Sequence, residues 1–436
     1  MIKIGFFQAT NAADIHWWPN LAFGSLKAYL HKYLGDSIVM ERANPGNLHE
    51  YDIAAISFIS QDYNIAKNII KNVKQRNPKA ITIAGGSHVT WLPGTLTPDF
   101  DFGVIGEGEQ TFLEFVKYVM NGQKIEELFT ICGLVFWRDG GLLCAPPRAL
   151  IEPIDNIPPP VRDNPGETMY YMFTSRGCPY KCTFCSSTAF WKKTRFHSAD
   201  YVVAEIERCI KMGARHIPIM DDLFCANRKR FAEILEKLKR TNLREQFNVN
   251  FMALARANLI DDELCKMLKE FPTTGAFFGA ESASDRILNL MNKGVTAAKN
   301  QEALDILHFH GIQANPSFIV GWPTETEEEI KTTLNFVIKN GRAGKMNIFS
   351  GVNVLTPFPG TKVWDDAIKT GKINLNNFNW DSLGIFASYM HSSYGNFDEW
   401  VADRKKHSSI YLNEETVPED RFYELLRKFN DEIRKG

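Results

Sequence analysis

The chain has 436 residues, which is long enough for two or three domains. Hydrophobic residues make up 44% and charged residues 23%, as in an ordinary globular protein. The formal net charge of -1 gives no electrostatic basis for binding nucleic acid or an anionic membrane, and no apolar run is long enough to span a bilayer. The N-terminus lacks the pattern of a signal peptide, so we expect a cytoplasmic protein.

Residues 1–130 alternate short apolar runs with helical patterns. The apolar runs are IKIGFF, DIAAISFI, AITIAGG and DFGVIGEGE. Repeated strands with helical crossovers predict an α/β domain built on a doubly wound parallel sheet, similar to a Rossmann fold. Ligands of such a sheet bind at the carboxyl ends of its strands.

Residues 131–168 contain IDNIPPPVRDNPGE and are predicted to be a linker. The alternation restarts at residue 169 and continues to about 375. Strands are expected at YYMFT, HIPIM, FNVNFM, GAFFGA, ANPSFIV and NIFSGVNV. Six strand–helix units predict a partial (β/α)6 barrel of the TIM type. Residues 376–436 are expected to form a short, mainly helical C-terminal segment.

Three of the eight cysteines lie within SRGCPYKCTFCSS, directly after the first barrel strand. Cys178, Cys182 and Cys185 follow the spacing C-x3-C-x2-C. A structural zinc site usually takes four protein ligands, often in two separated pairs. Three thiolates without a partner pair suit a cubane iron–sulfur cluster with one iron left open, although zinc and unliganded thiols remain alternatives.

This triplet, with Phe184 before its last cysteine, resembles the signature of the radical S-adenosylmethionine (radical SAM) enzymes. The resemblance implies a partial α/β barrel. It also implies that the three cysteines hold a 4Fe–4S cluster whose open iron binds S-adenosylmethionine. One-electron cleavage of the sulfonium then yields methionine and a 5′-deoxyadenosyl radical.

Several stretches at the predicted strand ends are similar to the cofactor-binding parts of the same family. Asp221 and Asp222 are candidates to meet the ammonium group of S-adenosylmethionine, or to cap a helix. Glu281 and Ser282 are candidates for its methionyl or ribose part, or for helix capping. Arg256 is a candidate for the carboxylate, with a structural ion pair as the alternative, and Gly321 and Pro323 are candidates for a backbone edge facing adenine. Phe184 completes the residues that the resemblance assigns to S-adenosylmethionine.

The stretches GGSHVTWLPG and DFGVIGEGEQTF resemble the cobalamin-binding domain that is fused to many of these enzymes. The resemblance implies that Ser57, Gly85 and Gly86 line the slot for the cobalamin tail. DIHWWP places Pro19 where the cobalt-ligand motif has glycine, so His16 is not expected to bind cobalt. Trp17 and Trp18 are expected to pack onto the following helix.

The resemblance predicts an enzyme that abstracts hydrogen from an unactivated position and, with cobalamin, transfers a methyl group to a carbon or phosphorus centre. The alternative is a radical enzyme that performs dehydration, ring contraction, epimerisation or oxidation. A methylthiotransferase is not expected, because no cysteine precedes Cys132. The expected partners are a small-molecule or peptide substrate and an electron donor such as flavodoxin or ferredoxin. Candidates for further catalytic groups are Tyr389, His391 and Cys225.

Overall fold

The computed structural model describes residues 1–10, 21–122, 124–164, 166–241, 249–348, 351–384, 396–407 and 411–434. The chain divides into two compact units, Met1–Asp163 and Asn164–Gly436. Within the described residues, no helix combines the length and apolar character that a membrane span requires. Each unit is an α/β fold with its own hydrophobic core.

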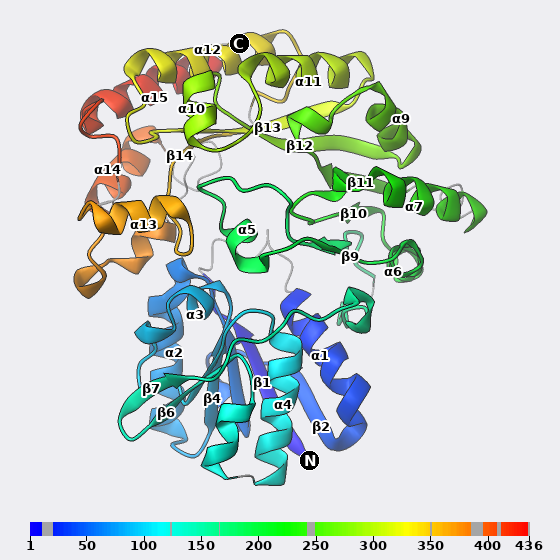
Figure 1. Ribbon diagram of the computed structural model, residues 1–436, viewed down its shortest axis with the longest axis vertical. Helices are drawn as coiled ribbons and strands as arrows, with labels where there is room; N and C mark the ends of the chain where they lie inside the picture. The colour runs from blue at the N-terminus through cyan, green and yellow to red at the C-terminus, as the bar shows by residue number, and fades with distance from the viewer. Residues whose placement is uncertain are drawn as a thin grey trace. The chain divides into compact units, whose positions relative to one another are not determined.

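The first unit is built on a seven-stranded sheet in the order β2-β1-β3-β4-β5-β6-β7 (Figure 1). The first five strands run parallel, and the last two are antiparallel additions. The strands are β1 (Ile2–Gln8), β2 (Ile38–Arg42), β3 (Ile53–Ser57), β4 (Ile81–Gly85), β5 (Phe102–Val104), β6 (Leu134–Arg138) and β7 (Gly141–Cys144). The parallel doubly wound sheet is confirmed, but the first part of the expected linker belongs to this sheet.

Helices cover both faces of this sheet. They are α1 (Leu21–Leu34), α2 (Tyr63–Arg76), α3 (Ser87–Trp91) and α4 (Gly108–Asn121). Helices α1 and α4 lie side by side and place Phe23, Leu30, Phe112 and Phe115 in one core with the sheet. Helix α4 ends where Gly122 takes a left-handed conformation with φ 58°.

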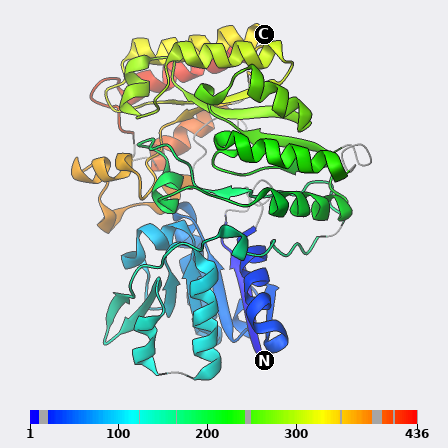
Figure 2. The same ribbon diagram turned by 45° about the vertical axis from the view of Figure 1, so that its right-hand side comes forward.

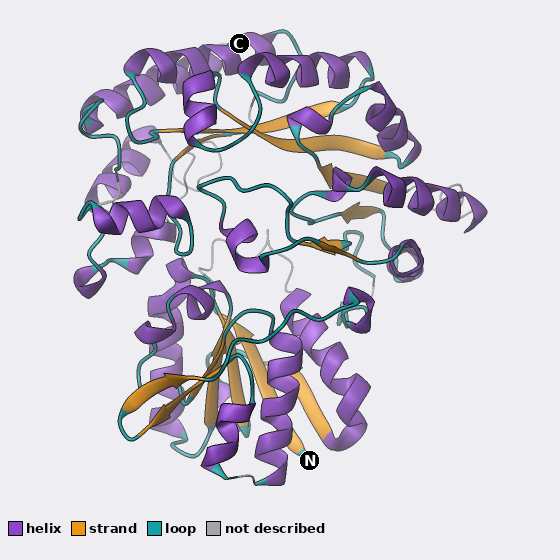
Figure 3. Ribbon diagram, in the orientation of Figure 1, coloured by secondary structure: helices purple, strands orange, loops and turns teal. Residues whose placement is uncertain are grey.

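The second unit contains a five-stranded parallel sheet in the order β10-β11-β12-β13-β14 (Figure 3). Its strands are β10 (His216–Pro218), β11 (Asn250–Leu254), β12 (Thr273–Glu281), β13 (Gln313–Val320) and β14 (Val352–Val354). The expected first strand joins through parallel bridges, Met169 to His216 and Met172 to Ile219. It leads into a short hairpin of β8 (Ser175–Arg176) and β9 (Arg195–Phe196). This topology is consistent with the expected six-unit partial barrel.

The second unit has helices along the outer side of its sheet and others at the carboxyl ends of its strands (Figure 2). They are α5 (Ser186–Trp191), α6 (Ala199–Lys211), α7 (Arg228–Thr241), α9 (Asp262–Glu270), α10 (Asp285–Leu290), α11 (Ala297–Phe309), α12 (Glu327–Arg342), α13 (Lys362–Lys369), α14 (Phe397–His407) and α15 (Glu419–Arg434). Helix α15 buries Phe422, Leu426 and Phe429 in the same core as the barrel sheet. The C-terminal segment is therefore part of the barrel unit.

Candidate active site

The three clustered cysteines lie on the loop between β8 and α5. Cys178, Cys182 and Cys185 are partly exposed, and the Cys185 N–H donates to the Cys182 carbonyl at 3.2 Å. Three other cysteines of this unit, Cys209, Cys225 and Cys265, are buried. The loop thus presents three accessible thiols at the carboxyl end of the first barrel strand, which is the catalytic face of such a barrel.

The Asp221–Asp222 pair holds the start of this loop. The Asp222 carboxylate accepts a hydrogen bond from the Gly177 N–H at 2.9 Å. The fully buried Asp221 carboxylate accepts four hydrogen bonds, from the N–H and hydroxyl groups of Thr174 and Ser175, at 2.5 to 3.0 Å. Asp221 therefore positions the strand that leads into the cysteines, and a contact of this Asp pair with the ammonium group of S-adenosylmethionine stays a prediction.

The far side of the loop is docked on residues that follow β12. The Thr183 N–H donates to the Met291 carbonyl at 3.0 Å, and the Asn292 amide donates to the Lys181 carbonyl at 2.7 Å. The Phe184 ring meets the Trp322 ring edge to face, with centroids 6.2 Å apart. Phe184 thus anchors the cysteine loop to a small core at the strand ends.

Arg256, directly after β11, reaches the cysteine loop. Its guanidinium Nη1 lies 3.6 Å from the Cys182 sulfur, and its Cζ lies 3.7 Å from the centre of the Tyr180 ring. The Tyr180 hydroxyl accepts a hydrogen bond from the Asn258 amide at 2.9 Å, which fixes the ring. Among the described residues, the buried Nε and Nη2 atoms of Arg256 have no hydrogen-bond partner. A buried cation with two unused donors is suited to an anionic ligand.

The thiol environment fits a bound metal cluster. Burial raises the pKa of the Cys178 thiol against the lowering effect of the Tyr180 N–H, and the neighbouring Cys185, Asp222 and Cys182 add to the increase. A cationic metal centre would compensate these three thiolates. Within the described residues, no three His, Cys, Asp or Glu side chains are placed to share one metal ion. A cubane does not require this, because each thiolate binds a different iron atom.

Glu281 and Ser282 take different positions at the end of β12. Glu281 is buried, has a positive φ of 63°, and pairs with Lys293 at 2.7 Å. Lys293 Nζ lies 5.9 Å from the centre of the Phe184 ring, so this ion pair borders the cysteine loop. Ser282 is fully buried and its hydroxyl lies 3.2 Å from that of Thr333 on α12. Ser282 therefore ties β12 to a helix, and its contact with S-adenosylmethionine stays a prediction.

The backbone edge at Gly321 and Pro323 is partly occupied by the protein itself. Gly321 has φ 84°, and both its N–H and that of Trp322 donate to Oε2 of Glu325, at 2.6 and 3.1 Å. A Cβ on Gly321 would lie 3.3 Å from the Phe422 ring. The N–H groups of Gly321 and Trp322 already donate to Glu325, so adenine would have to contact other backbone atoms at this edge.

The pKa of Glu325 gives a prediction for stability. Burial raises this pKa from 4.5 to about 7, against the lowering effect of the Trp322 and Gly321 N–H groups. The folded chain therefore holds this proton more tightly than the unfolded chain, and the associated stability is lost as the pH rises from about 4.5 through 7. We expect Glu325→Gln to remove about 3 kcal/mol of this pH dependence. The measurement is the free energy of unfolding in urea at pH 5 and at pH 8, and Glu328→Gln, at an exposed position, is the control. If the free energy of unfolding changes with pH by the same amount in wild type and Glu325→Gln, the prediction is wrong.

Cys225 follows the Asp pair and is enclosed in the core of the barrel unit. Its side chain is 1% exposed, and burial, with Asp221 nearby, raises its pKa to about 12. A neutral, enclosed thiol acts as a small packing group. We expect Cys225→Ala to keep cluster content and S-adenosylmethionine cleavage within about threefold of wild type. Product formation is measured in the same assay. If Cys225→Ala still cleaves S-adenosylmethionine but forms no product, Cys225 is catalytic.

In the first unit, Ser57 and Gly85 end adjacent strands. Ser57 pairs with Gln8 of β1, where the strand order 2-1-3-4-5 changes direction, which is the usual ligand site of such sheets. A Cβ on Gly85 would have no atom within 4 Å, so this position is open. A Cβ on Gly86, at φ 102°, would lie 2.3 Å from the Phe58 carbonyl oxygen. Glycine is thus required at position 86 because the Phe58 carbonyl lies so close to its backbone, whereas the space beside Gly85 is free.

Sequence reasoning did not identify His88, which holds the loops after β3 and β4. Its Nδ1 lies 3.0 Å from the Ser60 hydroxyl, and its Nε2 lies 2.8 Å from the Thr95 hydroxyl. Burial lowers its pKa to about 3, so the imidazole is neutral. Arg256–Cys182 and Lys293–Glu281 are further pairs that only the fold brings together. The candidates His16, Trp17, Trp18, Tyr389 and His391 lie outside the described residues.

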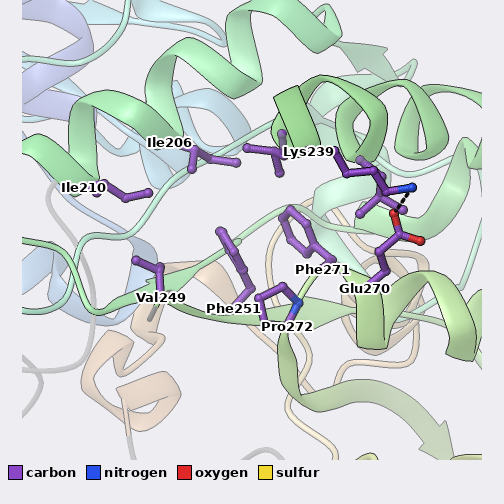
Figure 4. Close-up of a pocket in the computed structure, with 10 residues that line it drawn as sticks. Ile206, Ile210, Lys239, Val249, Phe251, Glu270, Phe271 and Pro272 are labelled. Carbon is purple, nitrogen blue, oxygen red and sulfur yellow. Dashed lines mark ion pairs between the residues drawn. The ribbon is translucent and has the colours of Figure 1, made fainter. Parts of the chain in front are cut away.

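A small hollow at the opposite end of the barrel sheet is not the site (Figure 4). It lies among α6, α7 and the start of β11, and the Lys239–Glu270 ion pair of 2.7 Å borders it. Its volume of about 40 Å³ has room for only a few water molecules. Ligand pockets are about 300–1,000 Å³ in volume, so this hollow does not bind a cofactor.

Comparisons with known proteins agree with this geometry. The radical SAM superfamily model matches residues 172–337, and the B12 binding domain model matches residues 47–116. An uncharacterized methyltransferase of Pyrococcus horikoshii is 32% identical over 386 residues, covering 85% of this chain and 81% of that protein. The chain belongs to the radical SAM superfamily. It is an enzyme whose family uses a 4Fe–4S cluster and S-adenosylmethionine, and its N-terminal B12-binding domain supports cobalamin as a further cofactor.

One further sequence relative and one solved structure are also similar to this radical SAM protein. The anaerobic magnesium-protoporphyrin IX monomethyl ester cyclase of Rubrivivax gelatinosus is 29% identical, and the match covers 65% of this chain and 53% of that protein. A structure of the cobalamin-dependent S-adenosylmethionine radical enzyme OxsB matches with a TM-score of 0.72 at 18% identity. This match covers 93% of this chain and 66% of that chain. The chain thus spans about half to two thirds of these two proteins, and the structural likeness concerns the fold.

Proposed function

We propose that this radical SAM protein transfers a methyl group to an unactivated carbon or phosphorus centre. The observation that carries the proposal is the set of three accessible thiols beside a buried arginine with two unused donors. The same chain has a B12-binding domain, and it is similar over most of its length to a methyltransferase. When bound, the cluster supplies the electron that cleaves S-adenosylmethionine, and cobalamin supplies the methyl group.

The described residues have separate tasks around these groups. Cys178, Cys182 and Cys185 would hold the cluster, and Asp222 keeps their loop in place through Gly177. The free Nε and Nη2 of Arg256 would pair with the carboxylate of S-adenosylmethionine, while the Tyr180 ring holds the guanidinium plane. In the first unit, the open space at Gly85 would receive the cobalamin tail.

The second candidate function is radical chemistry without methyl transfer. One relative of comparable identity is named a cyclase, so a protein that matches 65% of this chain is named for another outcome. In that case Arg256 and the three cysteines keep the tasks proposed above. The two candidates differ in whether corrinoid is bound and in whether a methyl group reaches the product.

The test begins with anaerobically purified protein that is reconstituted with iron, sulfide and cobalamin. Its ultraviolet–visible spectrum reports the cluster and the corrinoid together, and 5′-deoxyadenosine formation reports cleavage of S-adenosylmethionine. Deuterated methyl groups from labelled S-adenosylmethionine should appear in the product. Absence of bound corrinoid would favour the non-methylating function, and absence of 5′-deoxyadenosine would overturn both. In this preparation we also expect His16→Ala to leave the cobalt spectrum unchanged.

A further inference from the structure

The strands of the barrel sheet have two different faces. In β11, Phe251 and Ala253 are buried in the core with the helices, whereas Met252 and Leu254 between them are partly exposed. Because side chains alternate across a strand, the exposed set lies on the side turned away from the helices. We call this side of the sheet the inner face.

The inner face carries apolar, aromatic and uncharged polar side chains. It includes Phe173, Met252, Leu254, Phe277, Ser317 and Ile319. Phe173, next to the Met172–Ile219 bridge at the edge of the sheet, is 43% exposed, which is high for a phenylalanine. From the strand at 169–173 through β14, the described inner-face positions within the strands carry no Asp, Glu, Lys or Arg until the carboxyl ends, where Asp222, Arg256 and Glu281 lie.

The inner face leads to the cysteine loop. Arg256 continues the alternation of Met252 and Leu254 and contacts the Cys182 sulfur at 3.6 Å. Ile319 packs against the small core that also anchors Phe184. Charge is therefore concentrated where S-adenosylmethionine would bind, and the rest of the face offers apolar surface with hydroxyl and amide groups.

We propose that the inner face receives an uncharged, largely apolar part of the substrate, which is the part that reacts. The inference rests on the proposed function only in requiring radical chemistry at the cysteine loop. Apolar contact is favourable on such a surface, at about 25 cal/mol for each Å² removed from water. A charged group placed there would lose its hydration without gaining an ionic partner among the inner-face residues.

The experiment measures binding of a matched pair of probes by equilibrium dialysis to the reconstituted enzyme with S-adenosylmethionine present. N-phenyl-1-naphthylamine is uncharged, and 8-anilinonaphthalene-1-sulfonate is the same ring system with one sulfonate. We expect the uncharged probe to bind about tenfold more tightly or better than the sulfonate. Met252→Glu should weaken its binding about tenfold or more, whereas Met252→Gln, of the same size but uncharged, should stay within about threefold of wild type.

Equal binding of the uncharged probe to wild type and Met252→Glu would overturn the inference, and so would equal or tighter binding of the sulfonate. If Met252→Glu does not fold, Ser317→Asp compared with Ser317→Asn repeats the test on β13. Exposed Met120→Glu in the first unit controls for added charge. The readout is binding of the probe, so it does not depend on corrinoid content. If the probes bind as expected but no methyl group is transferred, the inference about the inner face holds and only the proposed methyl transfer is wrong. If methyl transfer is found but the probes do not bind as expected, only the inference about the inner face is wrong.

Discussion

The triple variant Cys178→Ala/Cys182→Ala/Cys185→Ala should contain no cluster iron and should not cleave S-adenosylmethionine. The three thiols share one partly exposed loop, and the buried thiols Cys209, Cys225 and Cys265 belong to the packed core of the barrel unit. The loop is held by hydrogen bonds from Gly177 to Asp222 and from Thr183 to Met291, which do not involve the thiols. The fold should therefore survive the loss of the cluster.

Iron and sulfide analysis of the reconstituted variant measures this result, with circular dichroism to confirm folding. The matched control is Cys132→Ala/Cys144→Ala, which removes two cysteines from the first unit and should leave iron content unchanged. Iron at the wild-type level in the triple variant would remove the basis for radical chemistry. Zinc content is measured in the same samples. If the wild-type protein contains zinc and the triple variant contains the same amount, that zinc is bound at another site.

Corrinoid retention should fall about tenfold or more in Gly85→Val, without a loss of stability. The Cβ position of Gly85 is open, so a valine there would occupy space at the strand ends and exclude a ligand. Gly86→Val should act differently, because its side chain would strike the Phe58 carbonyl oxygen at 2.3 Å and φ is 102°. Backbone strain of this kind costs about 1–3 kcal/mol, so this variant should lose stability even without ligand.

The two glycine variants are compared by corrinoid content after gel filtration and by thermal unfolding of the cobalamin-free protein. Gly94, which also has no atom within 4 Å of its Cβ position, provides a control through Gly94→Val. If Gly85→Val retains corrinoid as wild type does, the slot does not lie at this strand end. If both Gly85→Val and Gly86→Val are unstable, the open space at Gly85 is not available in solution.

The sequence predicted the features that depend on local spacing. The cysteine triplet and the apolar runs of β1, β3 and β4 are contiguous patterns, and the structure places them as expected. The Arg256–Cys182 contact joins residues 74 positions apart, and no local pattern predicts it. Strand β2 was missed because it ends in the exposed pair Glu41 and Arg42.

The roles of polar residues were harder to predict than their positions. A carboxylate at a strand end can face a ligand or the neighbouring backbone, and the sequence is the same in both cases. Asp221 faces Thr174 and Ser175, which precede it by 47 and 46 residues, so only the strand pairing determines its role. For Gly86, the Phe58 carbonyl by itself explains the need for glycine, and a place in the cobalamin slot stays a prediction.

Helix α15 belongs to the core of the barrel, and this has a consequence for how the protein is made. The first unit ends at Asp163 and can fold while the ribosome is still translating the rest of the chain. The second unit cannot bury the barrel core fully until Phe422 and Phe429 of α15 have been synthesised. During that interval the three loop thiols are already outside the ribosome without their finished surroundings. These thiols are therefore exposed on the nascent chain before the barrel core is complete, and a cell that makes this protein must keep them reduced during that interval.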